Sequence, residues 1–224
     1  MSGRFITFEG GEGAGKSTQI QRLLRRLKEA GVTAIATREP GGSPHAERIR
    51  DCVLSGAAKP FGPLAEAVLF SAARIDHLRE TIRPALARGA VVLCDRFADS
   101  TRAYQGVLGK LDPALIRSLE RATIGDTRPD LTLILDLPAS IGLARAAKRR
   151  GAGQSADRFE NEDPSFHEKL RAAFGTIARD EPERCVVIDA NRDADGVEAD
   201  IWRVVSERVL PALPAATRIN MADG

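Results

Sequence analysis

The residues best suited to chemistry lie in a glycine-rich stretch near the N-terminus. From Gly10 to Ser17 the sequence reads G-x-x-x-x-G-K-S, the pattern of a P-loop. Its glycines let the backbone turn so that N–H groups point at a phosphate chain. Lys16 adds a mobile positive charge, and the Ser17 hydroxyl can ligate Mg²⁺. A helix that starts here would aim its positive N-terminal end at the same anion. The motif therefore predicts a nucleoside triphosphate site.

The segments on both sides of this loop have the patterns that a P-loop needs. Residues 4–8 are apolar and β-prone, which is typical of a buried strand. Residues 18–30 carry apolar side chains at helical spacing, and Gly31 ends the run. The alternative is a glycine-rich turn with an accidental lysine, and the strand–loop–helix context disfavours it.

Strands and helices alternate along the rest of the chain. Apolar runs predict further strands at residues 33–37, 90–94, 131–135 and 185–188. Predicted helices fill the intervals, at residues 44–54, 64–79, 98–106, 113–123, 138–148, 164–179 and 196–209, with Ser43 as a plausible N-cap. The helix at 64–79 is expected to group five side chains near one face: Leu64, Val68, Ser71, Ile75 and Leu78. Solidly apolar strands between helices predict an α/β fold with a parallel sheet covered on both faces.

Length and composition restrict the class of protein. A chain of 224 residues with 43% hydrophobic and 29% charged side chains suits one soluble globular domain with at most a small appendage. No apolar run approaches the roughly eighteen residues of a membrane span, and the chain enters its first strand too early for a signal peptide. A net charge of +2 gives no reason to expect nucleic-acid binding. The three cysteines lack disulfide or zinc spacing, which favours a reducing cytoplasm.

A carboxylate and a guanidinium follow the predicted strand at 90–94 directly. Ligands of parallel α/β sheets bind at the carboxyl ends of the strands, so Asp95 and Arg96 should lie beside the P-loop. Asp95 is placed to hold or orient Mg²⁺ and its waters, and Arg96 to clamp an anion. The alternative is a surface salt bridge between the two side chains.

Two further groups of residues are open to more than one interpretation. The basic segment 148–158 is either a solvated charge cluster or a lid that brings an arginine to the transferring phosphoryl group. Phe70 and Arg74, spaced i and i+4, share a helix face. They could stack on a base and donate to it, although from the residues alone a core phenylalanine and a solvated arginine are favoured.

Taken together, these segments resemble the thymidylate kinases of the bacterial type over about residues 4–205. The motifs that carry the resemblance are Phe8–Thr18, Arg38–Gly42, Leu69–Arg74, Asp95–Phe97, Ser100–Gly106 and Asp157–Glu160. The resemblance implies a P-loop nucleoside monophosphate kinase fold with a five-stranded parallel sheet, and a homodimer packed through helices. It also implies transfer of the γ-phosphoryl group of ATP to dTMP, with Mg²⁺. The expected kinase domain spans residues 1–210 with a mobile lid at about 149–160, and the aperiodic residues 211–224 are expected to form a flexible tail.

The resemblance also implies a role for individual residues. ATP would lie on Gly10, Gly11, Glu12, Gly13, Ala14, Gly15, Lys16, Ser17 and Thr18, with adenine between Arg145 and residues 189–192. For dTMP it implies Glu12 at the sugar 3′-hydroxyl, Phe70 on thymine, Arg74 at thymine O4, Arg96 and Arg50 at the phosphate, Tyr104 against the deoxyribose, and Ser100 and Gln105 along the pocket. Ser17 and Asp95 would serve the metal.

Members of this family supply a catalytic arginine either from the P-loop or from the lid. The residue after Glu12 is Gly13, so the lid type is implied. Three lid arginines are candidates to act with Lys16, Asp95 and Arg96, namely Arg149, Arg150 and Arg158. A kinase of another nucleotide on the same scaffold and a non-catalytic P-loop switch protein are the alternatives.

The chemistry of arginine agrees with a thymine site. Arginine only donates hydrogen bonds, and thymine O4 accepts where cytosine presents an amino donor. A buried Arg74 facing cytosine would therefore leave donors opposed, at a cost of about 1–3 kcal/mol or more. Uracil lacks only the thymine methyl, which a hydrophobic pocket distinguishes by about 10–200-fold at best. We therefore expect dCMP to be a poor substrate and dUMP a weak one.

Overall fold

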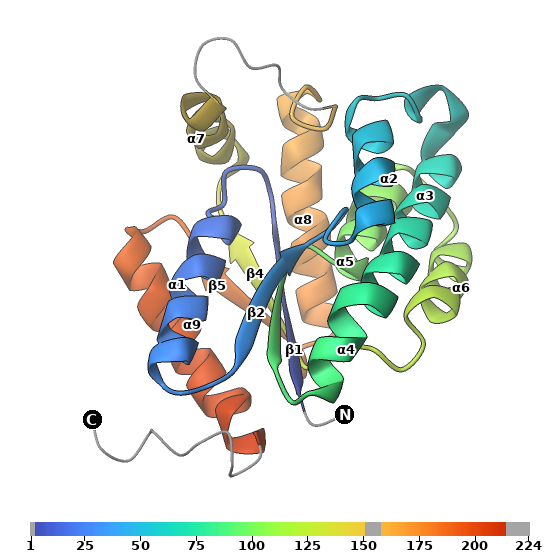
Figure 1. Ribbon diagram of the computed structural model, residues 1–224. Helices are drawn as coiled ribbons and strands as arrows, with labels where there is room; N and C mark the ends of the chain where they lie inside the picture. Colours follow the sequence, from blue (N-terminus) through green and yellow to red (C-terminus); the bar gives the residue numbers. More distant parts are fainter. Residues whose placement is uncertain (1–2, 151–157, 214–224) are drawn as a thin grey trace.

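A five-stranded parallel sheet forms the centre of the protein. The computed structural model describes residues 3–150 and 158–213, with Arg150 described by its backbone alone. The strands lie in the order β2-β3-β1-β4-β5 (Figure 1). Their bounds are Arg4–Gly10 for β1, Ala34–Arg38 for β2, Val91–Asp95 for β3, Leu131–Asp136 for β4 and Cys185–Asp189 for β5. Each of the five predicted strands is confirmed, and no predicted boundary differs from the observed one by more than two residues.

Helices cover both faces of this sheet, as the sequence predicts (Figure 1). Their bounds are α1 Lys16–Glu29, α2 Pro44–Leu54, α3 Gly62–His77, α4 Arg83–Ala87, α5 Ala98–Thr101, α6 Pro113–Ile124, α7 Ala139–Arg150, α8 Pro164–Asp180 and α9 Ala194–Arg208. Two π-helical turns continue α3 and α5, at Leu78–Ile82 and Arg102–Leu108. Ser43 has the extended backbone of an N-cap, but its hydroxyl donates to Asp76 Oδ2 at 2.6 Å instead of capping α2.

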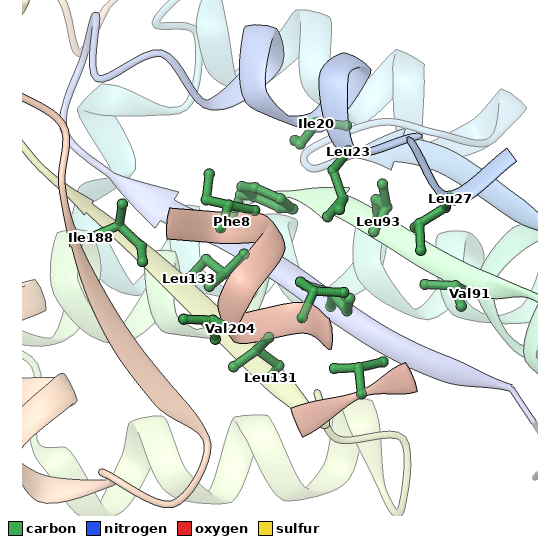
Figure 2. Packing of buried hydrophobic residues seen from close by; sticks show 14 of the residues in the cluster. Phe8, Ile20, Leu23, Leu27, Val91, Leu93, Leu131, Leu133, Ile188 and Val204 are labelled. Atoms are coloured by element: carbon green, nitrogen blue, oxygen red, sulfur yellow. The ribbon is translucent and has the colours of Figure 1, made fainter. Parts of the chain in front are cut away.

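Successive side chains of β1 point to opposite faces of the sheet and pack against different helices. Ile6 and Phe8 point toward α1 and α9 and join the larger apolar cluster, part of which Figure 2 shows. Phe5 packs on the opposite face, edge to face with Phe97 at a ring-centroid distance of 4.9 Å. Both faces of β1 are thus buried, which explains why apolar residues such as Phe5, Ile6 and Phe8 point to both sides.

The side chains expected near one face of the helix at 64–79 do not share one environment, since Ser71 and Leu78 are buried. In α3, Leu64, Val68 and Ile75 are 46%, 48% and 52% exposed. The helix instead buries a largely polar face, made of Glu66, Ala67, Ser71, Ala73, Arg74 and His77. Periodicity identifies the apolar stripe of a helix. In α3, however, the side that packs inward carries polar residues whose burial is compensated by hydrogen bonds.

The described chain ends in contact with the core. Residues 210–212 form a short 3₁₀ turn, and Leu213 belongs to the apolar cluster beneath α1 and α9. Packed structure thus continues to residue 213, past the expected domain boundary at 210, and residues 214–224 lie outside the described part. Among the helices of residues 3–150 and 158–213, none combines the length and apolarity required to span a bilayer.

A pair of truncations tests this account of the core. Leu93 on β3 is fully buried, so Leu93→Ala should lower the free energy of unfolding by about 2–5 kcal/mol. Val187 on the edge strand β5 is half exposed, and Val187→Ala should cost about 1 kcal/mol or less. Urea unfolding of both variants measures the difference, and equal losses would contradict the assignment of β3 to the core.

Candidate active site

A cavity of about 410 Å³ lies at the carboxyl ends of the strands. It gathers most of the residues that the sequence singles out: Glu12, Gly13, Ala14, Gly15, Lys16, Ser17, Thr18, Arg50, Phe70, Arg74, Asp95, Arg96, Ser100, Tyr104, Gln105 and Arg149. Gly10, Gly11, Arg145 and Arg158 are not among its lining residues. The cavity also contains residues to which the sequence assigned no individual role, although all but Leu54 lie in the motifs that carry the resemblance: Arg38, Glu39, Pro40, Leu54, Phe97, Thr101, Phe159 and Glu160.

The phosphate loop connects β1 to α1 as its motif predicts. Gly10 has φ of 133°, and a Cβ there would lie 2.5 Å from the carbonyl oxygen of Leu135, so only glycine fits. Gly15, with φ of 93°, leads into α1. Lys16 Nζ donates back to the Gly11 carbonyl at 2.9 Å. Burial and the neighbouring Arg96 charge lower the pKa of Lys16. An anion on the loop would relieve both effects.

A hydroxyl and a carboxylate meet beside this loop. Ser17 Oγ donates to Asp95 Oδ2 at 2.7 Å, across the gap between the start of α1 and the end of β3. Both are hard oxygen ligands of the kind that Mg²⁺ takes, and Mg²⁺ commonly uses one or two protein oxygens together with phosphates and water. No group of three or more acidic, histidine or cysteine ligands occurs within the described residues. The pair therefore fits a phosphate-bound Mg²⁺ rather than a metal held by protein alone.

Arg96 occupies a constrained position next to Asp95. Its backbone is left-handed, with φ of 67°, and its guanidinium donates to Glu12 Oε1 at 2.7 Å and to the Gly10 carbonyl at 3.1 Å. Burial by itself would raise the pKa of Glu12, but the charges of Arg96 and Lys16 outweigh it and lower the pKa to about 2. Arg96 does not form the alternative surface salt bridge with Asp95. Arg96 instead spans the phosphate loop.

Glu9 supports this arrangement from inside the sheet, and sequence reasoning missed it. Its carboxylate accepts from the Phe97 backbone N–H at 2.8 Å, and from the Ser100 hydroxyl at 2.7 Å. Burial, reinforced by Asp99, raises the pKa of Glu9 to about 7. A lone glutamate at the end of an apolar strand is the signal that marks it. Glu9 fixes the turn that carries Arg96.

An aromatic group and a buried arginine form the far end of the cavity. The rings of Phe70 and Tyr104 lie 6.3 Å and 5.1 Å from that of Phe159. Arg74 is only 4% exposed, so the solvated alternative for this side chain is wrong. Phe70 is half-buried and lines the cavity, where a flat ring could stack on it.

Two other predicted residues are held at the margins of this region. Arg50 Nη1 donates to the Pro40 carbonyl at 2.7 Å, so α2 is tied to the loop after β2. Gln105 is buried, and its amide donates to Glu66 Oε2 at 3.3 Å. Both side chains line the cavity while they keep these bonds.

The candidate arginines of the lid separate in space. Arg149 lines the cavity, with Nη2 3.8 Å from Glu160 Oε1. Arg158 instead lies 2.8 Å from Glu66 Oε1, with its guanidinium 4.3 Å above the Phe159 ring. The side chain of Arg150 and residues 151–157 of the expected lid lie outside the described part. Arg145 Nη1 donates to the Ala190 carbonyl at 3.3 Å, so α7 and the loop after β5 are neighbours.

Two glycines bring α7 against the phosphate loop. A Cβ on Gly13, which has φ of 66°, would lie 2.0 Å from the Gly142 carbonyl oxygen. A Cβ on Gly142 would lie 2.2 Å from the carbonyl oxygen of Glu12. The backbones of loop and helix are therefore in direct contact. A glycine inside the predicted helix at 138–148 is the feature of the sequence that could have indicated this contact.

This contact predicts a specific effect of one added methyl group. Alanine is intrinsically better than glycine in a helix, by about 0.5–1 kcal/mol. Gly142→Ala should nevertheless weaken ATP binding by about tenfold or more, because the loop or the helix must move. Gly175→Ala on α8 is the matched control, since its Cβ would meet only the flexible end of Arg179 at 3.5 Å. Calorimetric titration with ATP measures both, and wild-type affinity in Gly142→Ala would refute the tight contact.

Fold and site together define a class of protein. A P-loop, the nearby cation of Arg96 and an aromatic end share one cavity at the switch point of a parallel sheet. This is the arrangement of a P-loop nucleoside monophosphate kinase.

Comparison with known proteins identifies the family within that class. Residues 8–201 match the family model described as thymidylate kinase. A thymidylate kinase of Bradyrhizobium diazoefficiens is 61% identical over 93% of this chain and 91% of its own. One of Nitrobacter hamburgensis is 59% identical over 99% and 96%. The crystal structure of thymidylate kinase from Ehrlichia chaffeensis superimposes with a TM-score of 0.72 at 32% identity, over 92% of this chain and all of that one. The chain belongs to the thymidylate kinase family.

Proposed function

We infer that this chain phosphorylates dTMP to dTDP with ATP as the phosphoryl donor. The observation that carries this conclusion is the cavity itself, which joins the phosphate loop to a buried arginine and aromatic side chains at its far end. Membership of the thymidylate kinase family gives the acceptor base. Two anion sites in one cavity suit a transfer between two bound phosphates better than a nucleotide switch.

The residues divide between the two substrates along the cavity. The ATP phosphates lie on the backbone from Gly10 to Thr18 with Lys16 beside them, and adenine extends toward Arg145 and residues 189–192. The dTMP phosphate lies at Arg96, with Arg50 near it. Thymine stacks on Phe70, and Arg74 donates to O4. The sugar lies between Tyr104 and Glu12, which are already 3.4 Å apart from Oη to Oε1, with Ser100 and Gln105 completing the wall.

The reaction needs positioning and positive charge more than proton transfer. The acceptor is a phosphate oxygen that is anionic at neutral pH, so no side chain has to remove a proton. Lys16 and Arg96 flank the path between donor and acceptor, and they neutralise charge on the equatorial oxygens as the phosphoryl group moves in line. Arg149 lines the same cavity and is the described lid arginine best placed to assist. A closed lid over residues 149–160 remains a prediction, and it would exclude water.

Ser17 and Asp95 are the residues that would hold Mg²⁺. Their oxygen donor set fits the ion, and the two groups lie 2.7 Å apart. When bound, Mg²⁺ supplies Lewis-acid charge at the phosphates. Asp95 would also orient the waters bound to the metal, and the Ser17 hydroxyl would exchange its present hydrogen bond to Asp95 for a bond to the metal.

A substrate panel tests the assignment. ADP release from ATP with Mg²⁺ is measured with dTMP, dUMP, dCMP, ribothymidine monophosphate and no acceptor. We expect strong turnover with dTMP, weak turnover with dUMP and little with dCMP. Equal turnover with dCMP would refute the role of Arg74 while keeping the kinase. The absence of any turnover that depends on an acceptor would refute the kinase itself.

The three lid arginines should differ in their effect on rate. Arg149→Ala should lower kcat by about 100-fold or more while changing the KM for dTMP little, since its charge acts on the transferring group. Arg158→Ala should mainly lower the melting temperature, because it leaves the buried carboxylate of Glu66 without its cation. Arg150→Ala is measured beside them. A larger loss of kcat in Arg158→Ala than in Arg149→Ala would contradict this order.

The outward face of α3 supports the expected homodimer. Leu64, Val68 and Ile75 give this helix an exposed apolar stripe, and Leu115 on the neighbouring α6 is also 38% exposed. Monomeric proteins rarely leave such a stripe uncovered, and a second copy of the chain would bury it. Val68→Asp should therefore shift the protein to monomer in analytical ultracentrifugation. Val187→Asp, on the edge strand β5, is the control and should sediment as the wild type does.

The cellular setting belongs to the same proposal. We expect the enzyme to act in the cytoplasm, and the three cysteines support this, because Cys52, Cys94 and Cys185 are all unpaired thiols. We expect no role in nucleic-acid binding.

A further inference from the structure

Behind Arg74 lies a chain of buried polar side chains that the reaction does not use. Thr37 Oγ1 lies 2.7 Å from His77 Nε2, and His77 Nδ1 lies 3.1 Å from Glu39 Oε1. The other carboxylate oxygen, Glu39 Oε2, accepts from Arg74 Nε at 2.7 Å. Four side chains from β2, the loop after it and α3 thus form one continuous hydrogen-bonded series that ends at the cavity.

The order of donors along this series is fixed by its chemistry. A carboxylate only accepts, so the proton of His77 is on Nδ1, where it faces Glu39. In the neutral imidazole Nε2 then accepts the hydroxyl proton of Thr37. His77 has no exposed surface, and Glu39 and Arg74 are 6% and 4% exposed. A buried polar group that loses a hydrogen-bond partner is strongly destabilised. The position of each side chain in the series therefore restricts the orientation of the next one.

Arg74 is held on two of its three nitrogens. Nε is bound by Glu39, and Nη2 donates to the Phe97 carbonyl and to Thr101 Oγ1, each at 3.1 Å. Nη1 makes no hydrogen bond with any residue in the described ranges, and Arg74 lines the cavity. The plane of the guanidinium is therefore set from behind, and Nη1 is the group left for a ligand.

We propose that Glu39, backed by His77 and Thr37, is a positioning residue that fixes the Arg74 guanidinium and thereby sets the base selectivity of the acceptor site. The proposal rests on the dTMP kinase function given above. A fixed donor hydrogen-bonds to O4 of thymine or uracil and is repelled by the amino group of cytosine, which is also a donor. A guanidinium free to swing can move away from that amino group, so cytosine is rejected less strongly.

The proposal separates two selectivities that a folding defect would affect alike. Thymine and uracil both present O4, so the preference between them depends on contacts to the thymine methyl and not on the angle of Arg74. Loosening Arg74 should weaken only the discrimination against cytosine. A loss of folded protein lowers every rate equally and cancels in both ratios.

The experiment measures dTMP, dUMP and dCMP with wild type, Glu39→Gln and Thr37→Val. Selectivity is taken from kcat/KM for dTMP and dUMP and from the inhibition constant of dCMP against dTMP. Glu39→Gln should reduce the preference for dTMP over dCMP by about tenfold and raise the KM for dTMP. Its dTMP-to-dUMP ratio should stay within about twofold of wild type. Thr37→Val should shift the dCMP preference in the same direction by about two- to threefold.

Glu47→Gln is the matched control. Glu47 accepts from the Gly42 backbone N–H at 2.9 Å and so supports the same loop, but it does not contact Arg74 in the hydrogen bonds and ion pairs of the described residues. It should leave both ratios at their wild-type values. A change in the dCMP preference as large as that of Glu39→Gln would overturn the proposal, because general loosening of the loop would then explain it.

Arg74→Gln separates failure of this proposal from failure of the function. If the wild type does not phosphorylate dTMP, or Arg74→Gln keeps full rejection of dCMP, the function or its base reading is wrong. If Arg74→Gln loses the rejection and Glu39→Gln keeps it, positioning by Glu39 is wrong. Should circular dichroism show that Glu39→Gln is unfolded, His77→Gln and Thr37→Val decide, and unchanged ratios in both would refute the proposal.

Discussion

The parallel pairing of β1 with β3 is the constraint on which the site depends. Phe8 lies opposite Asp95, so the loops that leave the two strands emerge side by side at one edge of the sheet. Ser17 can then reach Asp95, and Arg96 can reach the Gly10 carbonyl. A slip of one residue in this register would turn every β1 side chain to the other face and separate these groups. The catalytic distances are thus consequences of how the sheet is paired.

Two of the cations in the cavity have carboxylate neighbours before any substrate enters. Lys16 and Arg96 bring two cations to a partly buried place, and Glu12 and Asp95 lie among them. The low pKa of Glu12 keeps its carboxylate ionised throughout the physiological range, so it remains a counterion for Arg96. An incoming phosphate competes with these carboxylates for the same cations. A substrate phosphate therefore takes over cations that the carboxylates already neutralise. Without a substrate, these carboxylates reduce the unfavourable free energy of keeping Lys16 and Arg96 close together.

Sequence reasoning found the parts of the protein whose physics is local. Strands buried on both faces read as unbroken apolar runs, and a P-loop has no substitute for its glycines and lysine. The inward face of α3 was missed because partners from distant segments, such as Glu39 for Arg74 and His77, decide it. Arg158 was grouped with the lid by its charge, and only the fold shows Glu66 beside it. The role of Gly142 depends on an approach between two backbones, which no pattern within one segment reveals.

The contact between Gly13 and Gly142 bears on protein engineering. Because a Cβ at position 13 would lie 2.0 Å from a backbone oxygen, an arginine cannot simply be grafted there to convert this enzyme to the variety that carries its catalytic arginine in the phosphate loop. Such a conversion requires that α7 be re-seated at the same time, and α7 also carries Arg145 and Arg149. Loop and helix therefore form one exchangeable module, and chimeras between the two varieties should be cut outside both.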